Sequence, residues 1–206
     1  MKIDLEHLHY WMQAIRESKD HMRTLDAFWR GQLRSKEWLV DTLVYHIYPE
    51  RNKVLDFPVS VDVHGGWVGV LSSMLFQSAI PIKHIRSIDI DPECEDVARV
   101  MNKGEEVVGK FSAITADMCD IVSEADIVIN TSCEHITQSQ YDSWLEGLRD
   151  DSIIVLQSNN YRLPEHIRHA DSLEHFKEQS HIAVEWAGEI DLPLYKRFMI
   201  IGKKHV

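Results

Sequence analysis

Cysteine and long apolar runs are both scarce in this sequence. Three cysteines occur among 206 residues and none belongs to a CxxC pair, so neither a disulfide framework nor a thiolate zinc site is expected. The longest apolar runs, such as residues 153–156, have the length of a strand, and the first residues, MKIDLEHLHYW, lack the apolar core of a signal peptide. The sequence therefore predicts a reduced, cytoplasmic protein with no membrane contact.

Basic residues are also scarce, which limits the classes of binding partner that the protein can have. Lys and Arg number 22 against 33 Asp and Glu, which gives a formal net charge of −11. Because such a surface is repelled by phosphate backbones, a nucleic-acid partner is not expected. The 12 histidines include two possible pairs, His7 with His9 and His166 with His169, but no HExxH motif and no Cys/His spacing. The sequence therefore predicts no metal site.

The first fifty residues have the pattern of interrupted helices. Apolar residues recur at three- and four-residue spacings over residues 5–15, and a second short helix is indicated over residues 25–33. Ser35 is a suitable N-cap for a third helix over residues 36–47, which the following Tyr-Pro pair would end. Because no Gly/Ser-rich linker follows, we expect residues 1–50 to form a helical cap that packs on the domain of residues 51–206.

From residue 57 onward, short apolar runs alternate with helix-like stretches, which is typical of an α/β domain. Strands are predicted over residues 58–63, 84–90, 111–115, 125–130, 152–157, 181–186 and 196–202. Helices are predicted over residues 68–77, 92–101, 139–148 and 171–179. The alternation implies right-handed crossovers and a parallel sheet. Because no helix separates the last two strands, the final strand is expected to return antiparallel.

Polar or glycine-rich segments follow four successive strands. Open parallel sheets bind ligands beyond the carboxyl ends of their strands, so these residues are the candidates for a site. Glycines after the first strand would let backbone amides approach a ligand closely. Four such strand ends in a row are improbable for plain turns. In chain order the candidates are Asp62, His64, Gly65, Gly66, Trp67 and Gly69, then Asp89 and Asp91, then Asp117 and Met118, then Asn130, Ser132, Glu134 and His135.

The runs VDVHGGWVG, IDIDPE, TADM and INTSCEH resemble the successive motifs of class I S-adenosylmethionine (SAM)-dependent methyltransferases. The order of elements is similar to that family's Rossmann-like fold, and the resemblance covers roughly residues 59–202. It implies a mostly parallel seven-stranded sheet with an antiparallel last strand, preceded by N-terminal helices. It also implies SAM as the cofactor.

The resemblance further implies how these residues would hold SAM. The acid and glycines of the first loop (Asp62, Gly65, Gly66, Gly69) would line the methionine part. Asp89 would hold the ribose with Asp91 near it, and Asp117 and Met118 would hold the adenine. Asn130 could hold the amino-acid group of SAM, while Ser132 and Trp67 are further cofactor candidates. The family usually has glycine where His64 stands, which makes His64 a candidate to face the active site.

Two polar clusters, after the fourth and the fifth predicted strand, contain the candidate catalytic residues. Glu134 and His135 are the candidates for acid/base work, the alternative being that they cap or start the next helix. A second polar cluster follows the fifth strand, with Tyr161 as its catalytic candidate and a polar turn as the alternative. It consists of Gln157, Asn159, Asn160 and Tyr161.

The resemblance and the acidic charge together favour a methyltransferase acting on a small molecule or peptide. The N/D-P-P-Y/F motif of amino-methylating nucleic-acid enzymes is absent after the fourth strand. Two alternatives remain open. One is a SAM-utilising lyase or cyclase that acts on the aminocarboxypropyl arm and releases methylthioadenosine, and the other is a non-catalytic SAM-fold binding protein. The acceptor and the oligomeric state cannot be read from the sequence.

Overall fold

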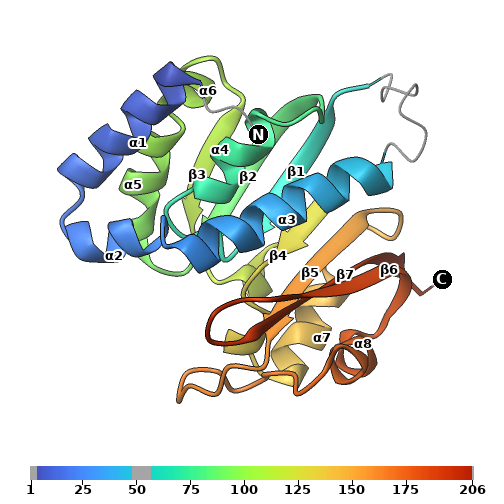
Figure 1. The fold of residues 1–206 in the computed structure, drawn as a ribbon. Coiled ribbons are helices and arrows are strands. Elements are labelled where there is room, and N and C mark those ends of the chain that lie inside the picture. The colour runs from blue at the N-terminus through green and yellow to red at the C-terminus, as the bar shows by residue number, and fades with distance from the viewer. Residues whose placement is uncertain (1–3, 48–56, 206) are drawn as a thin grey trace.

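A seven-stranded sheet forms the centre of the molecule (Figure 1). The computed structural model describes residues 4–47 and 57–205. The strand order is β3-β2-β1-β4-β5-β7-β6. The strands are β1 (Val59–His64), β2 (Ile82–Asp89), β3 (Phe111–Thr115), β4 (Ile127–Asn130), β5 (Ile153–Asn159), β6 (Ile182–Asp191) and β7 (Lys196–Lys204).

The first five strands run parallel, and only β7 runs the other way. β1 pairs in parallel with β2 and β4, β3 extends the sheet beyond β2, and β5 extends it beyond β4. β7 lies antiparallel between β5 and β6. The predicted seven-stranded sheet with an antiparallel last strand is therefore confirmed. The strand order reverses between β1 and β4, and this switch point is where open α/β sheets form ligand crevices.

Helices cover both faces of the sheet, as Figure 1 shows. One face packs against α3 and α4 with α1 and α5, and the other against α7 and α8. The sheet is therefore the middle layer between two hydrophobic cores. The helices are α1 (Leu5–Glu17), α2 (His21–Asp26), α3 (Arg30–Ile47), α4 (Val70–Phe76), α5 (Pro92–Met101), α6 (Lys103–Val107), α7 (Gln138–Glu146) and α8 (Leu173–Ser180), with short 3-10 turns η1 (Met118–Asp120) and η2 (Cys133–His135).

Helix α3 is longer than the sequence indicates. It begins at Arg30, so the predicted break between residues 33 and 36 does not exist, and Ser35 lies inside the helix instead of capping it. The apolar stripe of Leu39 and Leu43 is fully buried against the sheet, and the turn before it continues the same contact. Ser35 is buried, and its hydroxyl donates to Gln157 Oε1 at 3.2 Å. Because this contact satisfies the hydroxyl, Ser35 lies inside the helix and does not serve as its N-cap.

The N-terminal helices share the core of the sheet. Trp11 of α1 is 4% exposed and donates its indole hydrogen to Ser73 Oγ of α4 at 2.8 Å. The predicted helix end at Tyr48-Pro49 and the boundary between residues 50 and 51 lie outside the described residues. Across residues 4–47 and 57–205, none of the helices has the length and apolar character needed to cross a membrane.

Candidate functional site

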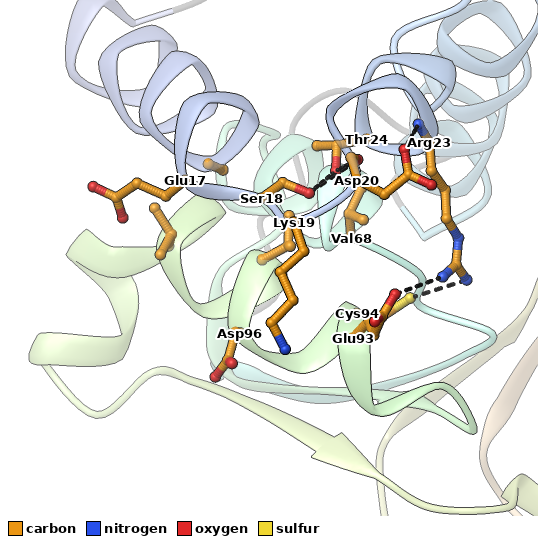
Figure 2. Close-up of a pocket in the computed structure, with 13 residues that line it drawn as sticks. Glu17, Ser18, Lys19, Asp20, Arg23, Thr24, Val68, Glu93, Cys94 and Asp96 are labelled. Atoms are coloured by element: carbon orange, nitrogen blue, oxygen red, sulfur yellow. Dashed lines mark hydrogen bonds and ion pairs between the residues drawn. The ribbon is translucent and has the colours of Figure 1, made fainter.

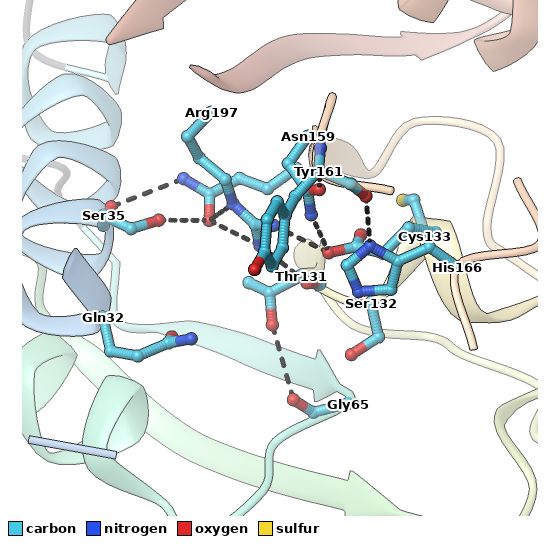
Figure 3. A network of polar contacts seen from close by, with 12 residues as sticks. Gln32, Ser35, Gly65, Thr131, Ser132, Cys133, Asn159, Tyr161, His166 and Arg197 are labelled. Carbon is cyan, nitrogen blue, oxygen red and sulfur yellow. Dashed lines mark hydrogen bonds and ion pairs between the residues drawn. The ribbon is translucent and has the colours of Figure 1, made fainter. Parts of the chain in front are cut away.

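A cavity of about 640 Å³ lies at the switch point of the sheet. Its walls come from the turns after β1 and β4, from the end of β2, from β5 and the loop after it, from β7, and from one face of α3. Figure 3 shows this meeting place, with Gln32 and Ser35 of α3 facing Arg197, Asn159 and Tyr161. Its size falls within the range of about 300–1,000 Å³ that is common for small-molecule sites.

The turn between β1 and α4 has an unusual backbone. Gly65 and Gly69 have φ angles of +66° and +79°, and Trp67 between them has φ +47°. A Cβ on Gly65 would lie 2.1 Å from Ser132 Oγ, so only glycine lets the turns after β1 and β4 approach this closely. A tryptophan held at positive φ is strained backbone of the kind that clusters at ligand sites.

Asp89, the last residue of β2, braces this turn and faces the cavity. Its Oδ2 accepts the backbone hydrogen of Trp67 at 2.8 Å and its Oδ1 accepts that of Asp91 at 3.1 Å. A carboxylate offers about four acceptor positions, so each oxygen of Asp89 can take one more donor. Half-buried and lining the cavity, it is suited to accept two neighbouring hydroxyl groups.

A buried ion pair closes the inner end of the cavity. Arg197 of β7 donates to Glu134 Oε1 and to the carbonyl of Thr131, each at 2.8 Å (Figure 3). The same Glu134 oxygen accepts from Asn159 of β5. The Glu134 side chain is 4% exposed, and its Oε1 is committed to Arg197 and Asn159. No hydrogen bond joins it to the His135 ring among the described residues.

Lys36 of α3 adds a second cation to the cavity. Its ammonium donates to Gln32 Oε1 at 2.9 Å and lies 5.8 Å from the ring centre of Trp67. Within the described part of the chain it pairs with no carboxylate. Burial, followed by repulsion from Arg197, lowers the pKa of Lys36 to about 7. Near neutral pH this amine can therefore act as a cation or as a base.

Aromatic side chains line the rest of the cavity. Tyr161 and Tyr195 are stacked with ring centres 5.6 Å apart, and His135 and His166 meet edge to face at 4.8 Å. His166 lies in the loop after β5 and holds the carbonyl of Tyr161 at 2.7 Å through Nδ1. The cavity thus combines cations with flat ring surfaces.

Several solved structures of SAM-dependent methyltransferases share this arrangement of strands and helices. No protein-family model matches the sequence, and no curated protein matches it either. The structure is similar to magnesium protoporphyrin IX methyltransferase from Synechocystis PCC 6803 with bound SAM, at 17% identity over 96% of this chain and 91% of that chain, with a TM-score of 0.61. The chain has the class I SAM-dependent methyltransferase fold.

Two further structural neighbours with this fold are a methyltransferase and a cyclase. Mitomycin 7-O-methyltransferase MmcR matches at 15% identity over 94% of this chain and 60% of that chain, with a TM-score of 0.59. The cyclase SpnF matches at 11% identity over 85% and 83%, with a TM-score of 0.64. At such identities the likeness establishes the methyltransferase fold, and the reaction has to be argued from the cavity.

The cavity brings together many of the residues predicted from the sequence. Those that line it are Gly65, Gly66, Trp67, Asp89, Ser132, Glu134, His135 and Tyr161. Gln157 and Asn159 line it as well, while Asn160 accepts the backbone hydrogen of Lys196.

The side chains of Asp62 and His64 lie on one face of β1, and helix α3, which lines the cavity, packs on the opposite face. Residues alternate across a strand, so both point toward α7 while Val61 and Val63 point toward α3. Asp62 is 2% exposed and pairs with Arg86, whose pKa it raises through their hydrogen bonds. Asp62 Oδ2 also accepts from Ser123, so Asp62 is held in a buried ion pair on this face of the sheet. Its predicted contact with the methionine part of SAM stays a prediction.

His64 is buried in the core where the methyltransferase fold usually has glycine. Its ring packs edge to face on Trp144 of α7 at 5.6 Å and is 0% exposed. Neither ring nitrogen has a hydrogen-bond partner among the described residues. Burial lowers the pKa of His64 to about 4, so the ring is neutral at physiological pH. It does not line the cavity, contrary to the expectation that it faces the active site.

The remaining predicted residues serve local structure next to the cavity without lining it. Gly69 is the N-cap of α4, and Asp117 caps η1 by accepting from Cys119. Asn130 donates to Met118 Sδ at 3.3 Å and accepts the backbone hydrogen of Ser132 at 2.9 Å. A contact of Asp117 and Met118 with adenine stays a prediction.

Arg23 ties the N-terminal helices to the part of the cavity near Asp89. Figure 2 shows a smaller cavity, about 170 Å³, between α1 and α2 on one side and α5 on the other. Arg23 lines both cavities and pairs with Asp91, whose pKa is lowered by a backbone hydrogen bond from Glu93 and by this arginine. Asp91 therefore caps α5 and fastens α2, two residues beyond Asp89.

From the sequence, Lys36, Tyr195 and Arg197 were not predicted as residues of the cavity, and His166 was considered only as a possible metal-binding pair with His169. One signal was available for Arg197. A charged residue inside the apolar strand KRFMIIG needs a buried partner, and Glu134 after another strand was the acid to consider. Lys36 gave no such signal, because surface lysines on helices are common.

Replacing His64 with leucine tests its buried, neutral state. Its folded pKa of about 4 lies below the ordinary 6.5, so the unfolded chain takes up the proton first as pH falls. Its contribution to stability is complete above about pH 6.5 and is lost toward pH 4. Between about pH 7 and pH 4.5 the wild type should lose about 2–3 kcal/mol more unfolding free energy than His64→Leu. Urea unfolding at both pH values measures this, with exposed His9→Leu as the control. Parallel pH curves for wild type and His64→Leu would contradict it.

Lys36 should react with amine reagents at an unusually low pH. With a pKa of about 7, half of its amine is neutral at pH 7, about a thousandfold more than for an ordinary lysine. Pulse acylation followed by mass spectrometry should give a labelling midpoint near pH 7 for Lys36, with exposed Lys103 as the comparison. A Lys36 midpoint above about pH 9 would rule out the lowered pKa.

Proposed function

We propose that this chain is a SAM-dependent methyltransferase acting on a small molecule. The observation that carries the proposal is the composition of one continuous cavity. A glycine turn and the half-satisfied Asp89 form one part of its lining, and Lys36 and Arg197 with aromatic rings form another. The first set suits a nucleoside with an amino-acid tail, and the second suits a polar, flat acceptor.

We propose SAM as the cofactor because the hydrogen-bond donors and acceptors around Asp89 and the glycine turn match those of SAM. Asp89 has acceptor capacity left for both ribose hydroxyls, and the turn at Gly65 and Gly66 exposes backbone to the cavity at the start of α4. Trp67 offers a ring face, which suits a sulfonium cation. Asp117 and Met118, one strand further out, are proposed for adenine. When bound, SAM supplies a methyl group activated by its positive sulfur.

The acceptor part favours a planar molecule that carries an anionic or ionisable oxygen. The stacked rings of Tyr161 and Tyr195 offer a flat apolar surface. Arg197 is neutralised by Glu134, whereas Lys36 has no carboxylate of its own among the described residues and can pair with an anion. A large polyanion does not suit an acidic chain whose cations are enclosed in a cavity.

Methyl transfer is an in-line displacement, so the enzyme contributes positioning and a place for the acceptor's proton. Lys36, with its pKa lowered to about 7, is the proposed proton acceptor, and His135 is the second candidate. Tyr161 is proposed to position the acceptor ring. Glu134 acts indirectly, because its carboxylate holds the guanidinium of Arg197 in place.

A second reaction in the same cavity is cleavage or cyclisation of the aminocarboxypropyl arm of SAM. The fold does not decide between this reaction and methyl transfer, because one fold serves more than one chemistry. The burial of His64 removes one reason for it, since that side chain does not enter the cavity. A non-catalytic SAM-binding role is the third outcome that experiments have to separate.

Product analysis distinguishes these reactions. The protein is incubated with SAM and pools of aromatic acids and phenols, and the nucleoside product is identified by mass spectrometry. Methyl transfer should give S-adenosylhomocysteine (SAH) only when an acceptor is present, and Lys36→Met should reduce the rate. Methylthioadenosine as the product would replace the proposal with the lyase or cyclase. SAM that binds but stays intact with every pool would favour the non-catalytic role.

Asp89→Ala should weaken SAH binding. Loss of charge-assisted hydrogen bonds, at about 1.5–3 kcal/mol each, corresponds to at least about a tenfold rise in Kd. Calorimetric titration with SAH measures it. Asp96→Ala is the matched control, because this exposed acid of α5 lies outside the larger cavity. Equal SAH affinity in the wild type and Asp89→Ala would remove Asp89 from the cofactor site.

A further inference from the structure

Three side chains that commonly bind metals meet at the wall of the larger cavity. Glu134 and His135 belong to η2 and His166 to the loop after β5, and one ligand atom of each lies within 4.8 Å of those of the other two. The imidazole rings are nearly perpendicular, at 83°. All three residues line the cavity, so an ion held among them could keep open positions for a substrate.

One carboxylate oxygen of Glu134 has no partner. Its Oε1 accepts from Arg197 and Asn159, whereas Oε2 is buried and accepts no hydrogen bond from any described residue. Glu134 is 3% exposed, so bulk water does not reach this oxygen freely. Leaving a buried acceptor without a hydrogen bond is unfavourable. A cation is the partner that such an oxygen lacks.

His166 is held in a tautomer that can bind a metal. Its Nδ1 lies 2.7 Å from the carbonyl oxygen of Tyr161, and a carbonyl can only accept. The hydrogen is therefore on Nδ1, and Nε2 keeps a free lone pair. Metal-binding histidines almost always donate their other ring nitrogen in this way. His135 is exposed, which leaves its ring room to rotate.

We propose that Glu134, His135 and His166 form a binding site for a divalent first-row transition-metal ion. Two imidazoles and one carboxylate are the ligands of many catalytic zinc sites and of non-heme iron(II) sites. Ligand atoms that share a tetrahedral zinc ion lie about 3.3 Å apart. The ligand atoms here all lie within 4.8 Å of one another, so their separations have to shorten by up to about 1.5 Å on binding. Rotation of the His135 ring provides such a movement.

The charges at this site call for an anionic oxygen as a further ligand of the ion. Glu134 is already paired with Arg197, and Lys36 lines the same cavity, so a dication adds positive charge that an ionised oxygen would balance. A metal ion also lowers the pKa of a hydroxyl that it binds. If the proposed methyl transfer operates, the ion would hold the acceptor oxygen in its reactive form. The metal site itself does not depend on that reaction.

Calorimetric titration of the untagged full chain with Zn²⁺, after removal of metals by a chelator and without SAM, tests the site. The wild type should bind one equivalent. His135→Ala and His166→Ala should each weaken binding by at least about 100-fold, the upper end of what losing an outer-sphere partner causes. Co²⁺ should give the visible absorption of a low-coordinate site in the wild type and in neither variant. Mg²⁺ should not compete, because it prefers oxygen ligands.

His169→Ala is the matched control. His169 lies in the same loop, within ion-pair distance of Asp171, and does not line the cavity, so its loss should leave Zn²⁺ affinity unchanged. The proposal is overturned if the wild type binds no Zn²⁺, or if it binds no more tightly than His135→Ala. Both histidine variants spare the Glu134–Arg197 pair and should fold. Because SAM is absent, failure here leaves the methyltransferase proposal untouched, and failure of SAH binding leaves this one untouched.

Discussion

The ion pair between Arg197 and Glu134 connects the parts of this molecule that form the candidate site. It joins the returning strand β7 to the turn after β4 across 63 residues of sequence. Through Gln157 the same arginine reaches Ser35 of α3. Removing one partner of such a buried pair typically costs about 3–5 kcal/mol. The antiparallel return of the last strand therefore does more than complete the sheet, because it brings a cation to the inner end of the cavity.

The sheet was predictable because its signals are local and repeated. Strand-length apolar runs such as those of β3 and β4 alternate with helical stretches, and α5 has the predicted bounds, residues 92–101. The long α3 was not predictable in full. Ser35 has the residue type of a cap, and its true partner, Gln157, lies 122 residues away. Such a tertiary contact outweighs the local preference of serine for an N-cap position.

The candidate site was predictable where backbone geometry forces a residue type. Gly65 packs against Ser132, and Asp89 ends its strand beside the glycine turn, so motif and position agree. Asp62 and His64 show that a sequence motif does not predict which face of a strand a side chain occupies. They belong to the same run of sequence, but alternation along β1 turns them toward α7 and away from the cavity. Lys36 and His166 come from segments without a motif, and only the folded chain brings them together.

We propose that this cavity, with Asp89 and the glycine turn, holds SAM beside an acceptor. A crystal structure of the chain grown with saturating SAH tests it most directly. We expect ribose hydroxyls on Asp89, the ring of Trp67 beside the sulfur, and open space from the sulfur toward Lys36 and Arg197. SAH bound in the smaller cavity beside Cys94, or the larger cavity left empty at saturation, would contradict it.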